Sequence, residues 1–146
     1  IMVPVLEPPN EKESKLGHWF AIAINLKSKC FQIFDSLRGK KDVDLRNTCS
    51  KLISVIKSLW KENFDTDEAT IKSIDDFDIQ YLDICFQTNS IDCGYYMLAF
   101  IDLWTGEKMP LFISDDVPKM RKKLLYDMLT SKRNKIDWKD LLNISS

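Results

Sequence analysis

Apolar stretches separated by short polar breaks cover the first quarter of the chain and predict three strands. Residues 2–6 form a short apolar stretch that ends at 7–10, where two prolines follow a glutamate. Residues 19–26 are almost continuously apolar and rich in aromatic and β-branched side chains, which indicates a strand buried on both faces. The polar residues 27–29 interrupt this run and residues 30–34 resume it, so the pattern predicts a hairpin.

The next segment has the period of an amphipathic helix. Either Asp42 or Asp44 suits its N-cap, and residues 65–78 after it are polar and acidic, which predicts a surface loop. Residues 79–86 then have the length and composition of another strand. The apolar positions that recur at helical spacing, and that we expect on the inner side, are Leu45, Cys49, Leu52, Ile53, Ile56, Leu59, Trp60 and Phe64.

Two further helices are predicted in the second half of the chain. Residues 93–104 are apolar nearly all round, as expected of a helix at the centre of a domain, and Gly106 ends this segment. Ser114 and the two aspartates after it suit the start of an amphipathic helix. The apolar positions expected on the inner side of that helix are Val117, Met120, Leu124, Leu125 and Met128. Strands followed by a helix, a further strand and two helices indicate an α+β fold, with helices packed on a small mixed or antiparallel sheet.

Composition leaves the predicted elements unchanged, but it bears on the number of domains and on the kind of partner. With 146 residues, an apolar content of 45% and a formal net charge of -1, we expect one domain over residues 1–146 and no nucleic acid as the main partner. Acidic residues dominate 62–83 and basic residues dominate 119–135. These segments are either two solvated faces or docking surfaces for a charged protein partner.

The cysteines argue against a metal or a disulfide framework. Cys30, Cys49, Cys85 and Cys93 show no close pairing, and with one histidine they make a poor zinc set, so we expect neither a metal nor another cofactor. We find neither a signal peptide nor an apolar stretch long enough to span a bilayer, so we expect an intracellular protein that does not bind membranes.

The run 87–94, Gln-Thr-Asn-Ser-Ile-Asp-Cys-Gly, is the best candidate for chemistry. A thiol at a loop-to-helix junction and an imidazole elsewhere are what amide hydrolysis through a thioester requires, and His18 is the one histidine. The helix N-terminus favours the thiolate of Cys93, and Gly94 leaves room for a substrate. Gln87 would donate to the oxyanion together with the Cys93 backbone N–H. On spacing alone, a small buried hydrophobe is an equal interpretation of Cys93.

The register of the predicted hairpin decides whether His18 can meet an acid. A two-residue loop at Lys27-Ser28 makes the numbers of opposite residues sum to 55, which places Asp35 opposite Phe20 and on the face of His18. A slip by one pair makes the sum 53 and sets Asp35 directly opposite His18. In either register Asp35 would fix the imidazole tautomer that leaves the other ring nitrogen free for the thiol. A loop-capping His18 and a turn residue Asp35 are the alternative.

The chain contains the motifs His18-Trp19, Phe34-Asp35-Ser36-Leu37 and Gln87-x-Asn89-x-x-Asp92-Cys93-Gly94. Together these three motifs resemble those of the ubiquitin-like protease (Ulp/SENP) family. The order of histidine, aspartate, glutamine and cysteine also matches this family and its adenoviral protease relatives. The resemblance covers residues 2–138 and implies a papain-like cysteine protease fold of the adenain/Ulp type. It further implies an enzyme that cleaves after the terminal Gly-Gly of SUMO or a related ubiquitin-like modifier, in precursors and in conjugates.

Carried over by position, the resemblance implies a role for each residue. Cys93 would be the nucleophile, His18 the base and then the acid, and Asp35 the residue that orients His18. Gln87 would be the oxyanion donor. Trp19 would line a narrow tunnel that admits the Gly-Gly tail and excludes every side chain, although a core tryptophan is the alternative. The expected partners are SUMO or another ubiquitin-like modifier and its conjugates, bound by a monomer in the nucleus or the cytoplasm.

Two departures from the family pattern bear on function. Ser90-Ile91 stands where the family commonly has glycine, in a loop that must turn sharply. Family catalytic domains usually extend further at the N-terminus, through a motif that forms the other wall of the tunnel, so we expect a domain that lacks part of its N-terminal subdomain. The alternative function is an inactive or truncated remnant that binds a modifier or a protein partner. An acyltransferase is a third interpretation, but nothing in the sequence points to an acyl donor site.

Overall fold

The computed structural model describes residues 1–9, 16–64, 73–110 and 114–141 of the chain. Its contacts divide it into two compact units, Ile1–Ser114 and Asp115–Ser146. All the predicted site residues lie in the first unit.

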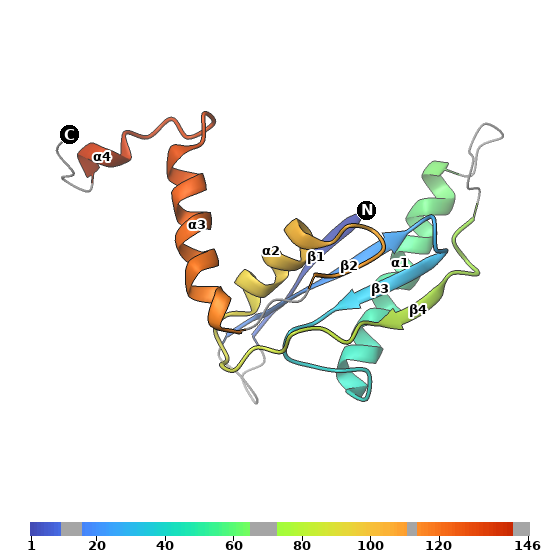
Figure 1. The fold of residues 1–146 in the computed structure, drawn as a ribbon. Coiled ribbons are helices and arrows are strands. Elements are labelled where there is room, and N and C mark those ends of the chain that lie inside the picture. Colours follow the sequence, from blue (N-terminus) through green and yellow to red (C-terminus); the bar gives the residue numbers. More distant parts are fainter. Residues whose placement is uncertain (10–15, 65–72, 111–113, 142–146) are drawn as a thin grey trace. The chain divides into compact units, whose positions relative to one another are not determined.

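The described part of the first unit is built on a four-stranded sheet in the order β1-β2-β3-β4. Its strands are β1 (Met2–Glu7), β2 (His18–Asn25), β3 (Cys30–Phe34) and β4 (Asp78–Tyr81). The first three strands are antiparallel neighbours, whereas β4 runs parallel to β3 after the crossover through α1 (Val43–Phe64) (Figure 1). The predicted α+β class with a small mixed sheet is confirmed.

The hairpin of β2 and β3 has the first of the two expected registers. Asn25 pairs with Cys30 and Ala21 with Phe34, so the numbers of opposite residues sum to 55. The side chain of Asn25 stabilises the turn by accepting a hydrogen bond from the Ser28 backbone N–H at 3.0 Å. Continuing this register by one pair brings Asp35 opposite Phe20, on the same face as His18.

The helix α1 covers one face of the sheet. It begins after Asp42, whose Oδ1 accepts the backbone N–H of Leu45 at 2.8 Å, so Asp42 and not Asp44 is the cap. Phe64 is exposed, against expectation, because it ends a helix of 22 residues that is longer than the strands beneath it. Leu59 is also exposed, because it lies about 120° around the helix from Ile53, whereas Trp60 packs on the core. The core on this face contains Phe20, Ile22, Ile24, Phe31, Ile33, Leu45, Cys49 and Ile53.

The helix α2 (Cys93–Leu103) covers the opposite face of the sheet (Figure 1). Alternation along β2 turns the small side chains of Ala21 and Ala23 toward α2, and both alanines are buried. On β3 the ring of Phe34 packs against Phe100 with the ring centroids 5.8 Å apart. Small residues beneath α2 therefore let its N-terminal end lie close to the sheet. Leu98 is exposed, however, whereas the all-apolar sequence of this helix predicts burial on every side.

Two predictions for the segment before α2 are wrong in part. The expected surface loop returns to the core at its end, where Ile74 and Phe77 are buried and Phe77 packs on Phe31; residues 65–72 lie outside the described part. The strand predicted over 79–86 ends at Tyr81. Its pairing stops because β3 itself ends, and the last hydrogen bond runs from the Leu82 N–H to the Ile33 carbonyl at 3.2 Å.

The second unit contains α3 (Val117–Thr130), preceded by a 3-10 turn at Ser114–Asp116, and a short helix α4 (Trp138–Leu141) that the sequence did not predict. Leu125 and Met128 were expected on the inner side of α3 but are exposed. No helix in the described ranges is long and apolar enough to cross a membrane.

Candidate active site

The β2–β3 hairpin joins His18 to Asp35. His18 is the first residue of β2 and Asp35 directly follows β3, and the register places both on one face. The Nε2 atom of His18 lies 2.9 Å from Asp35 Oδ1. The side chain of His18 is 15% exposed and that of Asp35 only 1%. The predicted contact between histidine and acid therefore exists, with the imidazole accessible and the carboxylate buried.

The turn after Asp35 keeps this carboxylate ionised. The backbone N–H groups of Leu37 and Arg38 donate to Oδ1 at 2.8 and 2.9 Å, and the Arg38 Nε donates to Oδ2 at 2.9 Å. Burial would raise the pKa of the Asp35 carboxyl, but the hydrogen bond and charge of His18, the charge of Arg38 and the Leu37 N–H hold that pKa below its usual value.

An ionised Asp35 fixes the tautomer of His18. A carboxylate only accepts hydrogen bonds, so the proton between the two groups is on Nε2 of the imidazole. The neutral ring then carries its lone pair on Nδ1, which can accept a proton from another group. This is the state that a general base requires.

Cys93 is the first residue of α2, where unpaired backbone N–H groups and the positive end of the helix dipole lie. The turn before it is held by Asn89, whose Oδ1 accepts the backbone N–H groups of Ile91 and Asp92, both at 3.0 Å. The Asn89 Nδ2 donates to Asp92 Oδ2 at 2.7 Å. An Asx turn thus makes the bend for which relatives commonly use glycine, so Ser90-Ile91 is accommodated without a left-handed residue.

Gln87 connects this loop to the turn after β3. Its backbone N–H donates to the Ser36 carbonyl at 2.7 Å, and its Oε1 accepts the Ser36 hydroxyl at 2.6 Å. Its Nε2 donates one hydrogen to the Asn89 carbonyl, and an amide carries two. The buried amide is therefore fixed between the histidine–aspartate turn and the cysteine loop, with one N–H left for a further acceptor.

Trp19 and Cys93 line one groove. Trp19 directly follows His18 but points to the other face of β2, and a Cβ built on Gly94 would lie 3.5 Å from its Cδ1. The groove has a volume of about 670 Å³. It is mostly apolar, and its walls are Leu6, Leu16, Gly17, Trp19, Ser90, Ile91, Cys93, Gly94, Tyr95, Met97 and Leu98.

The candidate residues form two assemblies that Gln87 and Trp19 connect. Asp35 and His18 are hydrogen bonded, while Cys93 shares the groove with Trp19. Across the described residues, no hydrogen bond joins the Cys93 thiol to His18. The two assemblies meet along β2, since His18 and Trp19 are consecutive.

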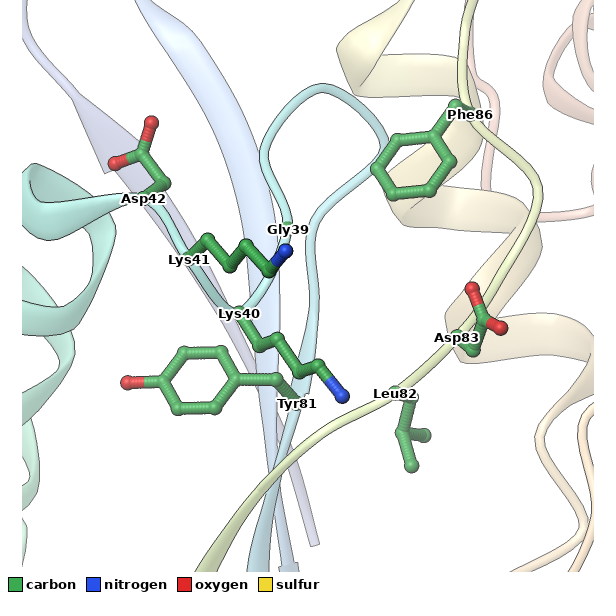
Figure 2. Close-up of a pocket in the computed structure, with 8 residues that line it drawn as sticks. All are labelled: Gly39, Lys40, Lys41, Asp42, Tyr81, Leu82, Asp83 and Phe86. Atoms are coloured by element: carbon green, nitrogen blue, oxygen red, sulfur yellow. The ribbon is translucent and has the colours of Figure 1, made fainter.

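A second pocket of about 340 Å³ lies elsewhere on the first unit, between the turn that precedes α1 and the segment after β4 (Figure 2). Lys40, Lys41 and Asp83 give it mixed charge, and Tyr81 and Phe86 give it two aromatic walls (Figure 2). None of the predicted site residues lines it. The groove beside Cys93 is therefore the pocket that the chemistry indicates.

The other cysteines are unsuited to the same role. Cys30 and Cys49 are buried in the sheet and beneath α1, and burial raises the pKa of the Cys49 thiol to about 12. Cys85 is half-buried, and its Sγ lies 3.7 Å from the Phe86 carbonyl. The described residues contain no group of three or more histidine, cysteine or carboxylate side chains that could hold a metal ion.

Comparison with protein families gives the fold and the site a context. The model of the Ulp1 protease family, C-terminal catalytic domain, matches residues 8–135. This chain belongs to that family. The family match includes all five predicted site residues, and it confirms the resemblance that the three motifs indicated.

Individual family members are distant. The chain is 26% identical over 121 residues to ubiquitin-like-specific protease 1A of Arabidopsis thaliana, covering 79% of this chain and 22% of that protein. It is 28% identical over 116 residues to human sentrin-specific protease 2, covering 77% of this chain and 18% of that protein. The chain thus spans about a fifth of the length of the curated relatives it matches.

Solved structures confirm a Ulp1-like fold. The C-terminal Ulp1 protease domain in complex with Smt3, the yeast ortholog of SUMO, superposes with a TM-score of 0.55 at 28% identity. The match covers 87% of this chain and 52% of that one. A Ulp1 structure whose catalytic cysteine is oxidised to a sulfenic acid matches with the same TM-score, identity and coverage.

Sequence reasoning did not single out Arg38 or Ser36 for the site. Arg38 donates to both carboxylate oxygens of Asp35, from its backbone N–H to Oδ1 and from its Nε to Oδ2. It also contacts Glu7, with 2.7 Å between Nη2 and Oε2. The available signal was the position of Arg38 three residues after Asp35, a spacing at which an Asx turn brings side chain and backbone together. Ser36 gave a weaker signal, because its bond to Gln87 spans 51 residues.

Proposed function

We propose that this chain is a thiol protease and isopeptidase that cleaves after the C-terminal Gly-Gly of SUMO or a related ubiquitin-like modifier. The supporting observation is the His18–Asp35 pair, whose carboxylate is buried, beside Trp19 in the wall of a groove that contains Cys93 at a helix N-terminus. Both precursor processing and release of modifiers from lysine side chains use the same chemistry, because each breaks an amide of a glycine carbonyl.

In the proposed reaction, the Cys93 thiol gives its proton to Nδ1 of His18 and its sulfur attacks the glycine carbonyl carbon. Negative charge then develops on the carbonyl oxygen, and the Cys93 backbone N–H and the remaining N–H of Gln87 stabilise it. His18 returns the proton to the leaving amine, which departs as the C–N bond breaks. Water hydrolyses the thioester in the second half of the reaction, with His18 again as base.

Asp35 supports both halves of this reaction without contacting the substrate. Its ionised carboxylate holds the Nε2 proton, and it stabilises the imidazolium that forms when Nδ1 is protonated. Trp19 sets the specificity in this proposal. Its ring lies against Gly94 at the wall of the groove, so a glycine tail passes where a residue with a side chain would clash.

Labelling by modifiers with a C-terminal thiol-reactive warhead tests this function. SUMO, ubiquitin and other ubiquitin-like proteins would each be offered to the wild type and to Cys93→Ala and Cys85→Ala. We expect labelling by one modifier class that Cys93→Ala abolishes and Cys85→Ala retains, because Cys85 is a free thiol that does not line the groove. Unchanged labelling in folded Cys93→Ala would overturn the proposal.

A second candidate is a module that binds a modifier without cleaving it. It is favoured by the lack of a hydrogen bond between Cys93 and His18 in the described residues. In that case a ubiquitin-like modifier would bind to the wild type in calorimetry, and Cys93→Ala would bind equally well. Turnover of a modifier fused to a fluorogenic amide would exclude this candidate.

A further inference from the structure

Arg38 links the buried aspartate of the site to a second carboxylate. Its Nη2 lies 2.8 Å from Asp35 Oδ2 and 2.7 Å from Glu7 Oε2, and its Nε donates to Asp35 Oδ2 at 2.9 Å. Arg38 is 17% exposed and Glu7 22% exposed, so the three charges form a largely buried network at the end of the sheet. A guanidinium is suited to this place because its planar fork reaches two acceptors at once.

Three segments of the fold hold this guanidinium. Glu7 is the last residue of β1 and pairs directly across the sheet with His18, the first residue of β2. Phe20 lies beneath the guanidinium, 5.6 Å from ring centroid to Cζ, and its ring is stacked with that of His18. Arg38 thus contacts three residues that each touch or pair with His18, namely Glu7, Phe20 and Asp35.

Without the cation, the network would be electrostatically unfavourable. Two carboxylates would face a neutral imidazole in a partly buried site, and like charges at such range repel. The remaining titratable neighbour is Cys49 of α1, which the charges of Arg38, Asp35 and Glu7 all reach. A thiol is neutral or anionic, so it cannot balance the carboxylates in either state. Burial raises the pKa of this thiol to about 12 and keeps it neutral. Arg38 is therefore the cation that faces both carboxylates, and together with His18 and the Leu37 N–H it keeps Asp35 ionised and in place.

We propose that Arg38 is a positioning residue of the catalytic site: by bridging Glu7 and Asp35 it fixes the carboxylate that selects the His18 tautomer. This inference rests on the proposed function for its kinetic consequence. Arg38 does not touch the substrate groove, so it acts through Asp35 and His18 alone. The geometry assigns Glu7 a supporting part, as the outer anchor of the guanidinium.

The kinetic test compares Arg38→Met, Arg38→Lys and the control Arg46→Met, in which an exposed arginine of α1 loses its charge. The substrate is the modifier identified by labelling, carrying a C-terminal fluorogenic amide. We expect Arg38→Met to lower kcat about 100-fold with little change in KM, as a misplaced catalytic group does. Its acidic limb of kcat/KM against pH should move to higher pH, since Asp35 is then protonated more readily. Arg38→Lys should retain the wild-type limb, and Arg46→Met should match the wild type.

A second measurement does not depend on turnover. The chain contains one histidine, so the ring signals of a ¹⁵N-histidine-labelled sample belong to His18 alone. We expect the wild type and Arg46→Met to show the neutral ring with its proton on Nε2, and Arg38→Met to show a mixture of both tautomers. This spectrum also reports whether the protein is folded, because a released histidine gives the shifts of an unstructured peptide.

The outcomes separate this inference from the proposed function. If no modifier is cleaved but Arg38→Met mixes the tautomers, the function fails and the positioning role stands. If the wild type cleaves a modifier and Arg38→Met has the same kcat, pH limb and tautomer, the positioning role is wrong and the function stands. A folded Arg38→Met with reduced kcat but an unchanged tautomer and pH limb would also overturn it, because the arginine would then act by another route.

Discussion

Asp35 is the most constrained side chain of the candidate site. One of its oxygens accepts the His18 ring N–H and two backbone N–H groups, and the other accepts the guanidinium of Arg38. A buried charge needs such partners, since an unpaired carboxylate would become protonated. The contacts that stabilise the buried Asp35 carboxylate therefore also select the tautomer of His18.

Replacing Asp35 by asparagine should separate charge from shape. Asparagine has nearly the same volume, but its amide can donate to the imidazole and favours the wrong tautomer. We expect kcat to fall by about 10⁴-fold in Asp35→Asn, as loss of the correct tautomer does in other proteases. Steady-state hydrolysis of the fluorogenic modifier measures this, and circular dichroism checks the fold. A loss smaller than tenfold in folded protein would show that Asp35 does not orient the base.

The four cysteines should differ sharply in reactivity. Cys30 and Cys49 are buried with raised thiol pKa values, about 12 for Cys49, so neither is available as thiolate near neutral pH. Cys93 is only 5% exposed but lines the groove, and Cys85 is half-buried. We expect iodoacetamide to alkylate Cys93 and Cys85 in the native protein, and Cys30 and Cys49 only after unfolding. Peptide mass spectrometry after timed labelling gives the order. Labelling of Cys49 in native protein at the rate of Cys93 would contradict it.

The sequence could predict the His18–Asp35 contact because it depends only on parity. Once residues 18–26 and 30–34 pair as a hairpin, an odd sum of numbers puts both side chains on one face. Which odd register forms depends on the turn, which the side chain of Asn25 helps to set. Arg38 could not be predicted, since its contacts require the turn conformation and the position of Glu7 in a third strand.

At the level of elements, one side of α2 is buried against the sheet while another side lines the groove. Its inner side packs on β2 and β3, which holds Cys93 against the sheet, while Leu98 and Tyr95 reach the groove from the exposed side. A continuously apolar sequence does not show which side of a helix faces solvent, so the exposure of Leu98 could not be read from the pattern. The apolar residues on that side of α2 are exposed because they form part of the groove wall.

Gly94 allows a direct test of this groove. In Gly94→Ala the new methyl would stand in ordinary contact with Trp19 Cδ1, at 3.5 Å, so no clash with the protein is expected. Alanine is the better helix former, so the free energy of unfolding should rise by about 0.5–1 kcal/mol. Labelling by the modifier warhead should nevertheless slow by at least tenfold, because the methyl narrows the path beside Trp19.

The matched control for this variant is Gly39→Ala, whose methyl would lie 3.7 Å from Phe86 in the pocket of Figure 2. We expect it to leave labelling unchanged. Chemical denaturation and labelling rates are the two measurements. Labelling of Gly94→Ala at the wild-type rate would mean that the substrate tail does not run along the groove wall that Gly94 and Trp19 form.

Element boundaries were the least predictable part of the fold. The strand predicted over 79–86 had suitable residues throughout but ended at Tyr81, because a strand lasts only as long as its neighbour. The exposure of Phe64 has a similar cause, since its helix extends beyond the sheet, whereas Leu59 lies away from the inner side of that helix. Local sequence determines which residues can form an element, whereas its partner determines where pairing and burial stop.

At the scale of the whole molecule, the network around Asp35 makes stability depend on pH. Its pKa is lower in the folded protein than the usual value of about 3.9 for an unfolded chain. The stabilisation is therefore complete above that value, and it is lost as pH falls through the lower folded pKa. We expect the difference in unfolding free energy between the wild type and Asp35→Asn to shrink as pH falls from 5 to 2.

Urea denaturation at a series of pH values measures this difference. The control is Asp44→Asn, which removes an exposed carboxylate in the first turn of α1 and should show no comparable loss. A wild-type advantage that stays constant across this range would contradict a lowered pKa for Asp35.

The two halves of the site also differ in sequence separation, that is, in how far apart along the chain their contacting residues lie. The His18–Asp35 contact spans 17 residues and forms within a hairpin, whereas Gly94, next to Cys93, meets Trp19 across 75 residues (94 − 19). Closing long loops is slow compared with forming a hairpin. A refolding chain should thus build its base and acid early and acquire its nucleophile late, so the reactive thiol is assembled only when the rest of the sheet is already in place.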